Sequence, residues 1–362
     1  MTSENPYQSL FWDMITSAQA AKASDIHIQP TPTGVLIRFR IFGELSQWAA
    51  ISESHRIAFL QESKRLCQCS LAISGRTQDS RISLPGQALD IRVSLIPSLF
   101  GEKLVMRLLD QTRSFSLVDV GLSAVAYQAI QDALAHKTGV NLLTGPTGSG
   151  KTTLLYSAIA NLDRAGLNII TIEDPVEYTF AGITQVQVTP RLTMNDALRA
   201  ILRQDPDIIL LGEVRDSESA ALCFQAASTG HLVLSTLHAN SAREAATRLT
   251  TLGVDRDLIR SCLKFTSAQR LLPKLCTKCR FVNLDPKITV QAGDSFYSRN
   301  LSGCESCHNG AVGRIPILEF IEWRSETNSL SSEPHYSITL KETAFAAAVK
   351  GEVDIYDALA IE

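Results

Sequence analysis

Residues 145–152 form the feature that most constrains what this chain can fold into. They read Gly-Pro-Thr-Gly-Ser-Gly-Lys-Thr and match the phosphate-binding pattern G-x-x-x-x-G-K-[ST] at every fixed position. An apolar run at 140–144 precedes this segment, and a helical pattern with an apolar face follows it from Thr153. A strand, a glycine-rich loop and a helix in this order predict an α/β core that holds a polyphosphate at a helix N-terminus.

The residues of this loop have separate expected roles. The glycines let backbone N–H groups close around phosphate oxygens, Lys151 reaches the β- and γ-phosphates, and the Thr152 hydroxyl ligates Mg²⁺. The alternative is a glycine-rich turn with a solvated lysine, but the flanking strand and helix favour a nucleotide site. The residues expected to bind the nucleotide are Gly145, Pro146, Thr147, Gly148, Ser149, Gly150, Lys151, Thr152 and Thr153.

Composition sets outer limits on the class of protein. The chain has 362 residues, enough for two or three domains. Its 34 basic and 37 acidic side chains give a net charge of -3 with no block of like charges, which argues against a nucleic-acid track. No apolar stretch approaches the roughly 20 residues that span a membrane, and residues 1–30 lack a signal-peptide pattern. We therefore expect a cytoplasmic protein that binds no nucleic acid.

The pattern of apolar residues divides the chain into zones. Residues 1–112 combine a first helix with short alternating runs, which predict an α+β domain with an antiparallel sheet. Residues 119–270 alternate helical patterns with near-continuous apolar strands, which are typical of a parallel sheet covered on both faces. Residues 271–320 carry four cysteines, and residues 321–362 are expected to form a terminal helical segment.

Two acidic segments follow apolar strands in the second zone. Ligands of open α/β folds bind at the carboxyl edge of the sheet, where such residues lie. We expect Glu177, in the box at 172–177, and Glu213 to serve catalysis, with Glu213 completing the Mg²⁺ shell and polarising the attacking water. For the box at 172–177, the alternative is an ordinary acidic turn. Arg215 and Asp216, which follow Glu213 in the second segment, could instead form a structural ion pair.

Histidines bracket the next apolar strand. His231 precedes it and His238 ends it, and we expect at least one of them to sense the γ-phosphate. The alternative is a structural role. Residues seven positions apart on an extended strand face opposite sides, so the two histidines need not share a role.

Four of the eight cysteines form two C-x-x-C pairs, the spacing of a four-thiolate zinc site. Four thiolates close the coordination sphere, so such a site would be structural. The alternatives are a reduced thiol set or a redox pair, and His308 could substitute as a ligand. The expected zinc ligands are Cys276, Cys279, Cys304 and Cys307. The other four lie in apolar patterns and are expected to pack in cores: Cys67, Cys69, Cys223 and Cys262.

In combination and in order, these segments resemble the secretion ATPases that power type II secretion, type IV pilus assembly and DNA-uptake pili. The matching segments are the phosphate loop, the acidic box, the strand ending in Gly-Glu-Val-Arg-Asp and the histidine box. Residues 23–28 and 101–110 upstream are similar to the second N-terminal domain of that family. The downstream match comprises residues 268–271, the four cysteines and residues 313–314.

The resemblance implies a RecA-like ATPase core that follows a PAS-like α+β domain and precedes a zinc subdomain and C-terminal helices. It also implies ATP, Mg²⁺ and Zn²⁺ as cofactors and a homohexamer with nucleotide between the N-terminal domain and the core. Arg92 and Arg107 match the family's phosphate-contacting arginines, with sheet-surface ion pairing as the alternative. The implied partners are an inner-membrane platform protein and a membrane-anchored adaptor at the cytoplasmic face.

The departures from the family pattern refine this expectation. The extra N-terminal domain of many members is not expected, because the 23–28 segment comes almost at once, so the length resembles the shorter competence-type members. Retraction motors lack the tetracysteine segment, which favours assembly over retraction. Two rival functions remain, a nucleic-acid translocase on the same fold and a scaffold that binds nucleotide without turnover. The intact Lys151, Thr152, Glu177 and Glu213 argue against the scaffold.

Overall fold

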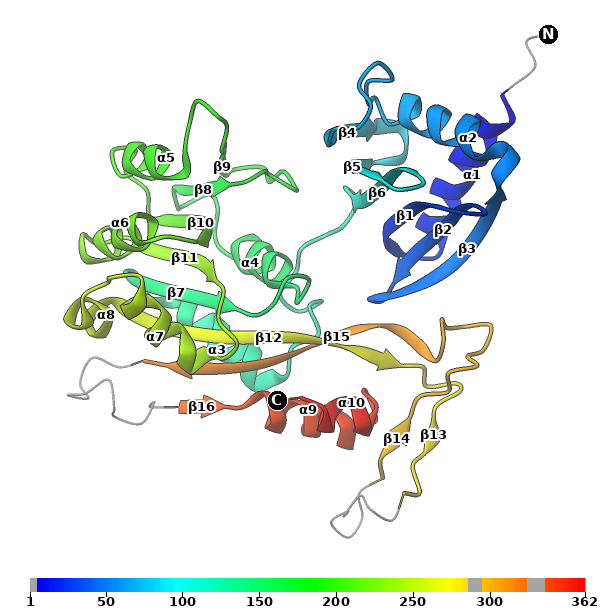
Figure 1. Cartoon of the computed structure of the whole chain (residues 1–362). Coiled ribbons are helices and arrows are strands. Elements are labelled where there is room, and N and C mark those ends of the chain that lie inside the picture. The colour runs from blue at the N-terminus through cyan, green and yellow to red at the C-terminus, as the bar shows by residue number, and fades with distance from the viewer. Residues whose placement is uncertain (1–4, 286–294, 324–335, 362) are drawn as a thin grey trace. The chain divides into compact units, whose positions relative to one another are not determined.

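The computed structural model describes residues 5–285, 295–323 and 336–361. The contacts within it divide the chain into two compact units, Met1–Ser114 and Phe115–Glu362 (Figure 1). Each unit builds its own hydrophobic core around its own sheet.

The first unit is an antiparallel six-stranded sheet in the order β3-β2-β1-β6-β5-β4, with two helices packed on it. Phe11 of the first helix and Phe59 of the second are fully buried with Ile26 and Met106 of the central strands. The elements are α1 (Pro6–Ala20), β1 (Ala23–Thr31), β2 (Gly34–Ile41), β3 (Glu44–Ser52), α2 (Glu53–Leu66), β4 (Gln78–Leu84), a 3₁₀ turn (Pro85–Gln87), β5 (Leu89–Ser98) and β6 (Gly101–Asp110). This α+β unit matches the fold expected from the alternating runs.

The second unit contains an eight-stranded mixed sheet in the order β16-β15-β12-β7-β11-β10-β8-β9. Every pairing from β12 to β9 is parallel, and the β12–β15 and β15–β16 pairings are antiparallel. Its elements as far as β12 are α3 (Ala124–Ala135), β7 (Gly139–Thr144), α4 (Lys151–Ala160), β8 (Ile169–Glu173), β9 (Thr184–Gln187), α5 (Met194–Ile201), β10 (Ile208–Val214), α6 (Ser217–Ser228), β11 (Leu232–Leu237), α7 (Ala242–Thr251), α8 (Arg256–Cys262) and β12 (Leu263–Leu275).

Helices cover both faces of this sheet and explain its apolar strands. Phe224, Leu249 and Ile259, from α6, α7 and α8, belong to the core on one face. Ile130 and Leu154, from α3 and α4, belong to the core on the other. Strands β7, β8 and β11 are therefore buried along their whole lengths, as a parallel sheet between two helical layers requires.

The remaining elements are β13 (Phe281–Val282), β14 (Tyr297–Ser298), β15 (Ala311–Glu322), β16 (Tyr336–Ile338), α9 (Leu340–Val349) and α10 (Ile355–Leu359). Among them, β15 and β16 extend the sheet beyond the parallel strands, and β13 and β14 form a separate two-stranded sheet. Helices α9 and α10 share a small core with Ile315 and Ile317 of β15. Strand β12 runs without interruption through residue 270, the expected boundary between the ATPase core and the cysteine segment, so the division of the second unit stays a prediction.

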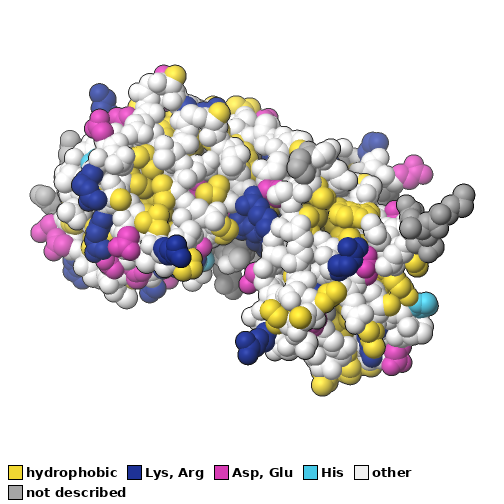
Figure 2. Space-filling view, turned by 90° about the horizontal axis from the view of Figure 1, so that it is seen from above, with side chains coloured by type: hydrophobic (Ala, Val, Ile, Leu, Met, Phe, Trp, Pro, Cys, Tyr) yellow, Lys and Arg dark blue, Asp and Glu magenta, His cyan; other side chains and the backbone are white. Residues whose placement is uncertain are grey.

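The surface of the second unit mixes charges of both signs. On the face drawn in Figure 2, its basic and acidic side chains are interspersed. Within the described ranges, no helix combines the length and the apolar character that a bilayer span requires.

Candidate nucleotide site and cysteine cluster

The predicted phosphate loop connects the carboxyl end of β7 to the first turn of α4. Gly145 and Gly148 adopt φ angles of 138° and 80°, which L-residues with a side chain rarely reach. A Cβ at Gly145 would also lie 2.6 Å from the carbonyl oxygen of Gln269 on β12. The loop thus requires glycine both for its backbone angles and for its close approach to β12.

The start of α4 leaves backbone donors available to a ligand. The helix begins at Lys151, directly after Gly150, and no side chain caps it. Its first turn carries no acidic residue either. The first N–H groups of any helix lack partners within the helix, and the helix dipole adds positive potential there. This arrangement is suited to bind an anion such as a phosphate.

Lys151 lies against the loop that precedes it. Its Nζ donates hydrogen bonds to the carbonyl oxygens of Gly145, at 2.7 Å, and Pro146, at 2.9 Å. Burial lowers the pKa of Lys151, and the positive charge of Arg270 lowers it further, while the negative charge of Glu213 opposes the shift. The ammonium therefore lies within the electrostatic reach of Glu213, as a nucleotide site on this edge requires.

Glu213 lies at the carboxyl edge of the sheet, in contact with other residues of the predicted motifs. Near the end of β10, it forms an ion pair with Arg215, and its Oε2 lies 3.3 Å from Nε2 of His238. Arg215 also lies 3.8 Å from Asp174 of the acidic box. The alternative pair of Arg215 with Asp216 is absent, because Asp216 instead caps α6 by accepting from the Ser219 backbone N–H at 2.8 Å.

The structure separates the two histidines. Strands β7 and β11 are parallel, and Leu237 pairs with Thr144, so His238 lies at the same edge as the phosphate loop. The carbonyl oxygen of His231 accepts from the N–H of Gly139 at the start of β7. Six residues of strand, about 20 Å, lie between the two histidines. Within one chain, His231 is therefore not brought to the phosphate loop.

The acidic box also contains a buried carboxylate to which the sequence assigned no role. Glu173 is 5% exposed and accepts hydrogen bonds from Tyr156, from Thr171 at 2.6 Å and from Gln185 at 3.1 Å. Burial, followed by the nearby Glu173 charge, raises the pKa of Tyr156, which keeps this phenol protonated as a donor. Glu177, which the sequence favoured, is half-buried. Its backbone forms a hydrogen bond with the phenol of Tyr156. The sequence signal that could have identified Glu173 was its position as the last residue of an apolar strand.

The two predicted arginines are neighbours in the first unit. Arg92 on β5 and Arg107 on β6 are direct cross-strand partners. Arg107 is 56% exposed, and its Nε lies 3.0 Å from the buried carboxylate of Asp25, which also lies 3.8 Å from Arg40. Arg107 thus makes the surface ion pair that the sequence left open as its alternative role. A contact of either arginine with phosphate stays a prediction.

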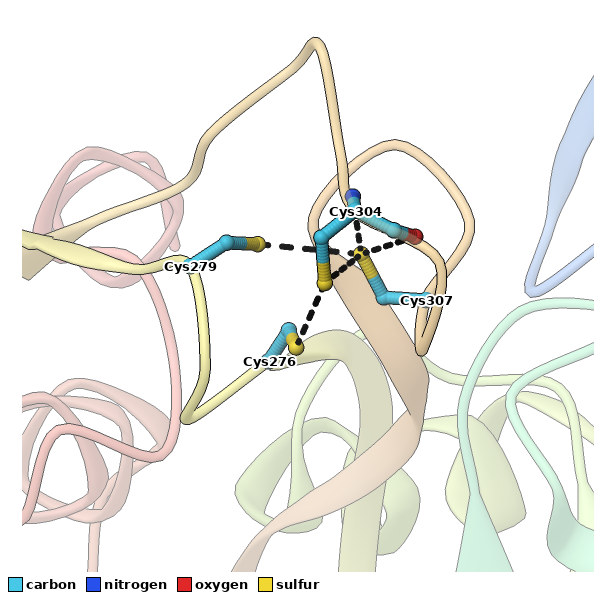
Figure 3. Close-up of side chains that lie close together, drawn as sticks. All are labelled: Cys276, Cys279, Cys304 and Cys307. Atoms are coloured by element: carbon cyan, nitrogen blue, oxygen red, sulfur yellow. Dashed lines mark hydrogen bonds between the residues drawn. The ribbon is translucent and has the colours of Figure 1, made fainter.

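The four predicted cysteines form one compact cluster (Figure 3). Cys276 follows the end of β12, and Cys307 precedes β15. The Sγ–Sγ distances are 3.8 Å for Cys276–Cys304, 3.7 Å for Cys279–Cys307 and 3.6 Å for Cys304–Cys307. Tetrahedral zinc with Zn–S bonds of about 2.3 Å needs sulfurs about 3.8 Å apart, whereas a disulfide needs about 2.05 Å. The donor set therefore fits a four-thiolate zinc site.

The pKa values of these thiols link metal binding to pH, because a metal binds the deprotonated thiolate. Burial and hydrogen bonds with the other cysteines raise the pKa of Cys279 to about 12. Burial opposes ionisation of Cys307 as well, but hydrogen bonds from Cys304 and other neighbours outweigh it and lower its pKa to about 7. A bound metal would replace the remaining thiol protons, so its affinity should increase with pH. His308 does not belong to the cluster.

Comparison with known proteins identifies relatives over most of the chain. The family model described as "Type II/IV secretion system protein" matches residues 1–353. The type II secretion system protein HxcR of Pseudomonas aeruginosa is 41% identical over 343 residues, which are 93% of this chain and 71% of that protein. The type IV pilus assembly ATPase PilB of Myxococcus xanthus is 40% identical over 321 residues, 84% of this chain and 57% of that protein.

A solved structure supports the fold. The ATPase DotB of Legionella pneumophila superposes with a TM-score of 0.73 at 22% identity, covering 97% of this chain and 95% of that one. These findings confirm the expected fold class and the resemblance that the motifs indicated.

Proposed function

The chain belongs to the type II/IV secretion system protein family and is an ATPase, and we propose that it is the motor that drives assembly of a type II secretion pseudopilus or a type IV or competence pilus. One observation carries this proposal: the phosphate loop and Glu213 lie at the same carboxyl edge of the sheet, because Val214 pairs with Leu237 and Leu237 pairs with Thr144, the residue before the loop. A nucleotide-binding loop with a nearby carboxylate supplies the groups that phosphoryl transfer to water needs.

The residues of this edge would have separate roles in ATP binding and hydrolysis. The loop N–H groups and Lys151 hold the phosphates, and the Thr152 hydroxyl provides a Mg²⁺ ligand. Glu213 orients the attacking water, and His238, 3.3 Å from Glu213, holds that carboxylate or contacts the γ-phosphate. Glu177 is proposed as a second acidic contributor. Magnesium, when bound with ATP, neutralises charge that develops on the phosphates.

The arginines of the first unit would complete the site. We propose that Arg92 and Arg107 approach the phosphates during the cycle, where a guanidinium stabilises transition-state charge. Such a motion requires Arg107 to exchange its ion pair with Asp25 for a phosphate. We also propose a homohexamer that works through a platform protein at the inner face of the cytoplasmic membrane, with a membrane-anchored adaptor as a further partner.

The cysteine cluster has a structural role in this proposal. Cys276, Cys279, Cys304 and Cys307 would bind one Zn²⁺ and tie the ends of β12 and β15 together. Four thiolates leave no coordination position for a substrate, so the zinc would take no part in hydrolysis.

Phosphate release measured on the purified chain, with and without single- and double-stranded DNA, tests the proposal against its rivals. We expect Mg²⁺-dependent hydrolysis that DNA does not stimulate. Strong stimulation by DNA would instead support a translocase on the same fold. Nucleotide binding without turnover, including in the presence of the membrane platform protein, would support a scaffold.

A further inference from the structure

Gln269 lies beside the phosphate loop and is absent from the roles assigned so far. It follows Ala268, which pairs with Thr144 at the last residue of β7, so its own neighbour across the sheet is the loop itself. The side chain is 2% exposed. Gln269 is therefore a buried polar residue whose surroundings are the phosphate loop.

The side chain makes one defined contact with the loop. Its Nε2 donates a 2.7 Å hydrogen bond to the carbonyl oxygen of Ser149. That carbonyl shares a peptide group with the N–H of Gly150, and the two point in opposite directions in a planar trans peptide. By fixing the carbonyl toward β12, Gln269 directs the Gly150 N–H away from β12.

The loop and the glutamine fit each other closely. Gly150 has a φ of 89°, and a Cβ added there would lie 2.7 Å from the same Nε2. Among the described residues, Oε1 of Gln269 has no hydrogen-bond partner. A buried acceptor without a partner costs free energy, so an apolar side chain would fill this space at lower cost. The functional group of Gln269 at this position is therefore its amide N–H, which donates to the Ser149 carbonyl.

We propose that Gln269 is a positioning residue of the ATPase: through the Ser149 carbonyl it orients the Gly150 N–H toward the phosphates of the bound nucleotide. This inference rests on the proposed nucleotide binding at residues 145–153. It makes β12 a support for the loop, in addition to its pairing with β7.

Two variants of the full-length chain separate the hydrogen bond from packing. Gln269→Met keeps an unbranched side chain of similar size without a donor. Gln269→Glu keeps the shape, replaces the donor with an acceptor and adds negative charge near the phosphates. Ser267→Ala is the matched control, because Ser267 is fully buried on the same strand and its Oγ has no partner among the described residues.

The readouts are the Kd of a fluorescent ADP analogue, the kcat and KM for ATP, and the melting temperature without nucleotide. For Gln269→Met we expect a Kd and KM raised roughly threefold to tenfold, since one neutral hydrogen bond is lost. We expect kcat and the nucleotide-free melting temperature to change little, a larger loss of affinity in Gln269→Glu, and no change in Ser267→Ala.

A wild-type Kd in either Gln269 variant would overturn the inference. If the melting temperature without nucleotide also fell in that variant, the side chain would serve packing alone. If Gln269→Met fails to fold, the Kd of the ADP analogue for Gln269→Glu tests the inference instead. Wild-type protein that binds the ADP analogue but hydrolyses no ATP would refute the motor proposal and leave the binding comparison decisive for Gln269. Wild-type protein that binds no ADP analogue would overturn both.

Discussion

Strand β12 contacts two sites of opposite character. Beside Gln269, the phosphate loop leads into a helix start without a cap, and the acidic edge leaves His238 57% and Arg215 59% exposed. Seven residues later, Cys276 joins three other sulfurs that all lie within 4.8 Å of one another. The first site presents donors and charges that a ligand can use, whereas the second directs its ligand atoms at a single point. In the proposed function, this difference corresponds to turnover at the first site and to local folding at the second.

The largest effect of breaking the first site should follow from Lys151→Ala. The ammonium is a charged donor to the phosphates, and loss of such a hydrogen bond costs about 1.5–3 kcal/mol. We expect nucleotide Kd to increase about 10- to 100-fold in a fluorescence titration. Lys137→Ala removes the same charge from an exposed position preceding the opposite end of β7, so its Kd should match wild type. Equal affinities for wild type and Lys151→Ala would remove this lysine from the site.

Breaking the second site should leave the first intact. Cys304→Ser removes one of four thiolates, and we expect loss of the metal and unfolding of the β13–β14 pair between the cysteine pairs, because metal binding supplies folding free energy. Cys262→Ser, at a buried position outside the cluster, should retain about one zinc per chain in metal analysis. Nucleotide Kd should stay within about twofold of wild type in both variants. A native chain that is well folded without metal, or that contains a disulfide within a C-x-x-C pair, would contradict the structural role.

A smaller change sharpens the account of the loop itself. Gly148 and Gly150 both have positive φ, so alanine at either costs about 1–2 kcal/mol of backbone strain. Only at Gly150 would the new Cβ also meet Gln269, since the space around Gly148 is open. We expect Gly150→Ala to weaken ADP binding a few-fold more than Gly148→Ala. The reverse order would show that β12 does not support the loop.

Part of this architecture was predictable because the signals are local. The phosphate loop, the parallel strands and the cysteine pairs are each encoded by spacing over a few residues. The edge occupied by His231 was also predictable, since the two ends of one strand lie at opposite edges of a parallel sheet. The burial of Glu173 was not predictable, because it depends on contacts with Tyr156 and Gln185 from other elements. The pairing of Arg215 with Asp174 likewise depends on the strand order.

The contact of Gln269 with Ser149 shows the same limit most clearly. The two residues are 120 positions apart, and only the parallel pairing of β12 with β7 brings them together. The sequence identified the segment around Gln269 as part of a family pattern but contained no local signal for its partner.

Single-turnover hydrolysis by Glu213→Gln tests the central claim, that ATP is hydrolysed at this edge of the sheet, most directly. The substitution keeps the size of the side chain and removes the carboxylate that would orient the water. The account predicts near-wild-type nucleotide Kd and a hydrolysis rate lower by a factor of about 10² to 10⁴. Wild-type hydrolysis in Glu213→Gln, with ATP bound at the phosphate loop, would contradict it.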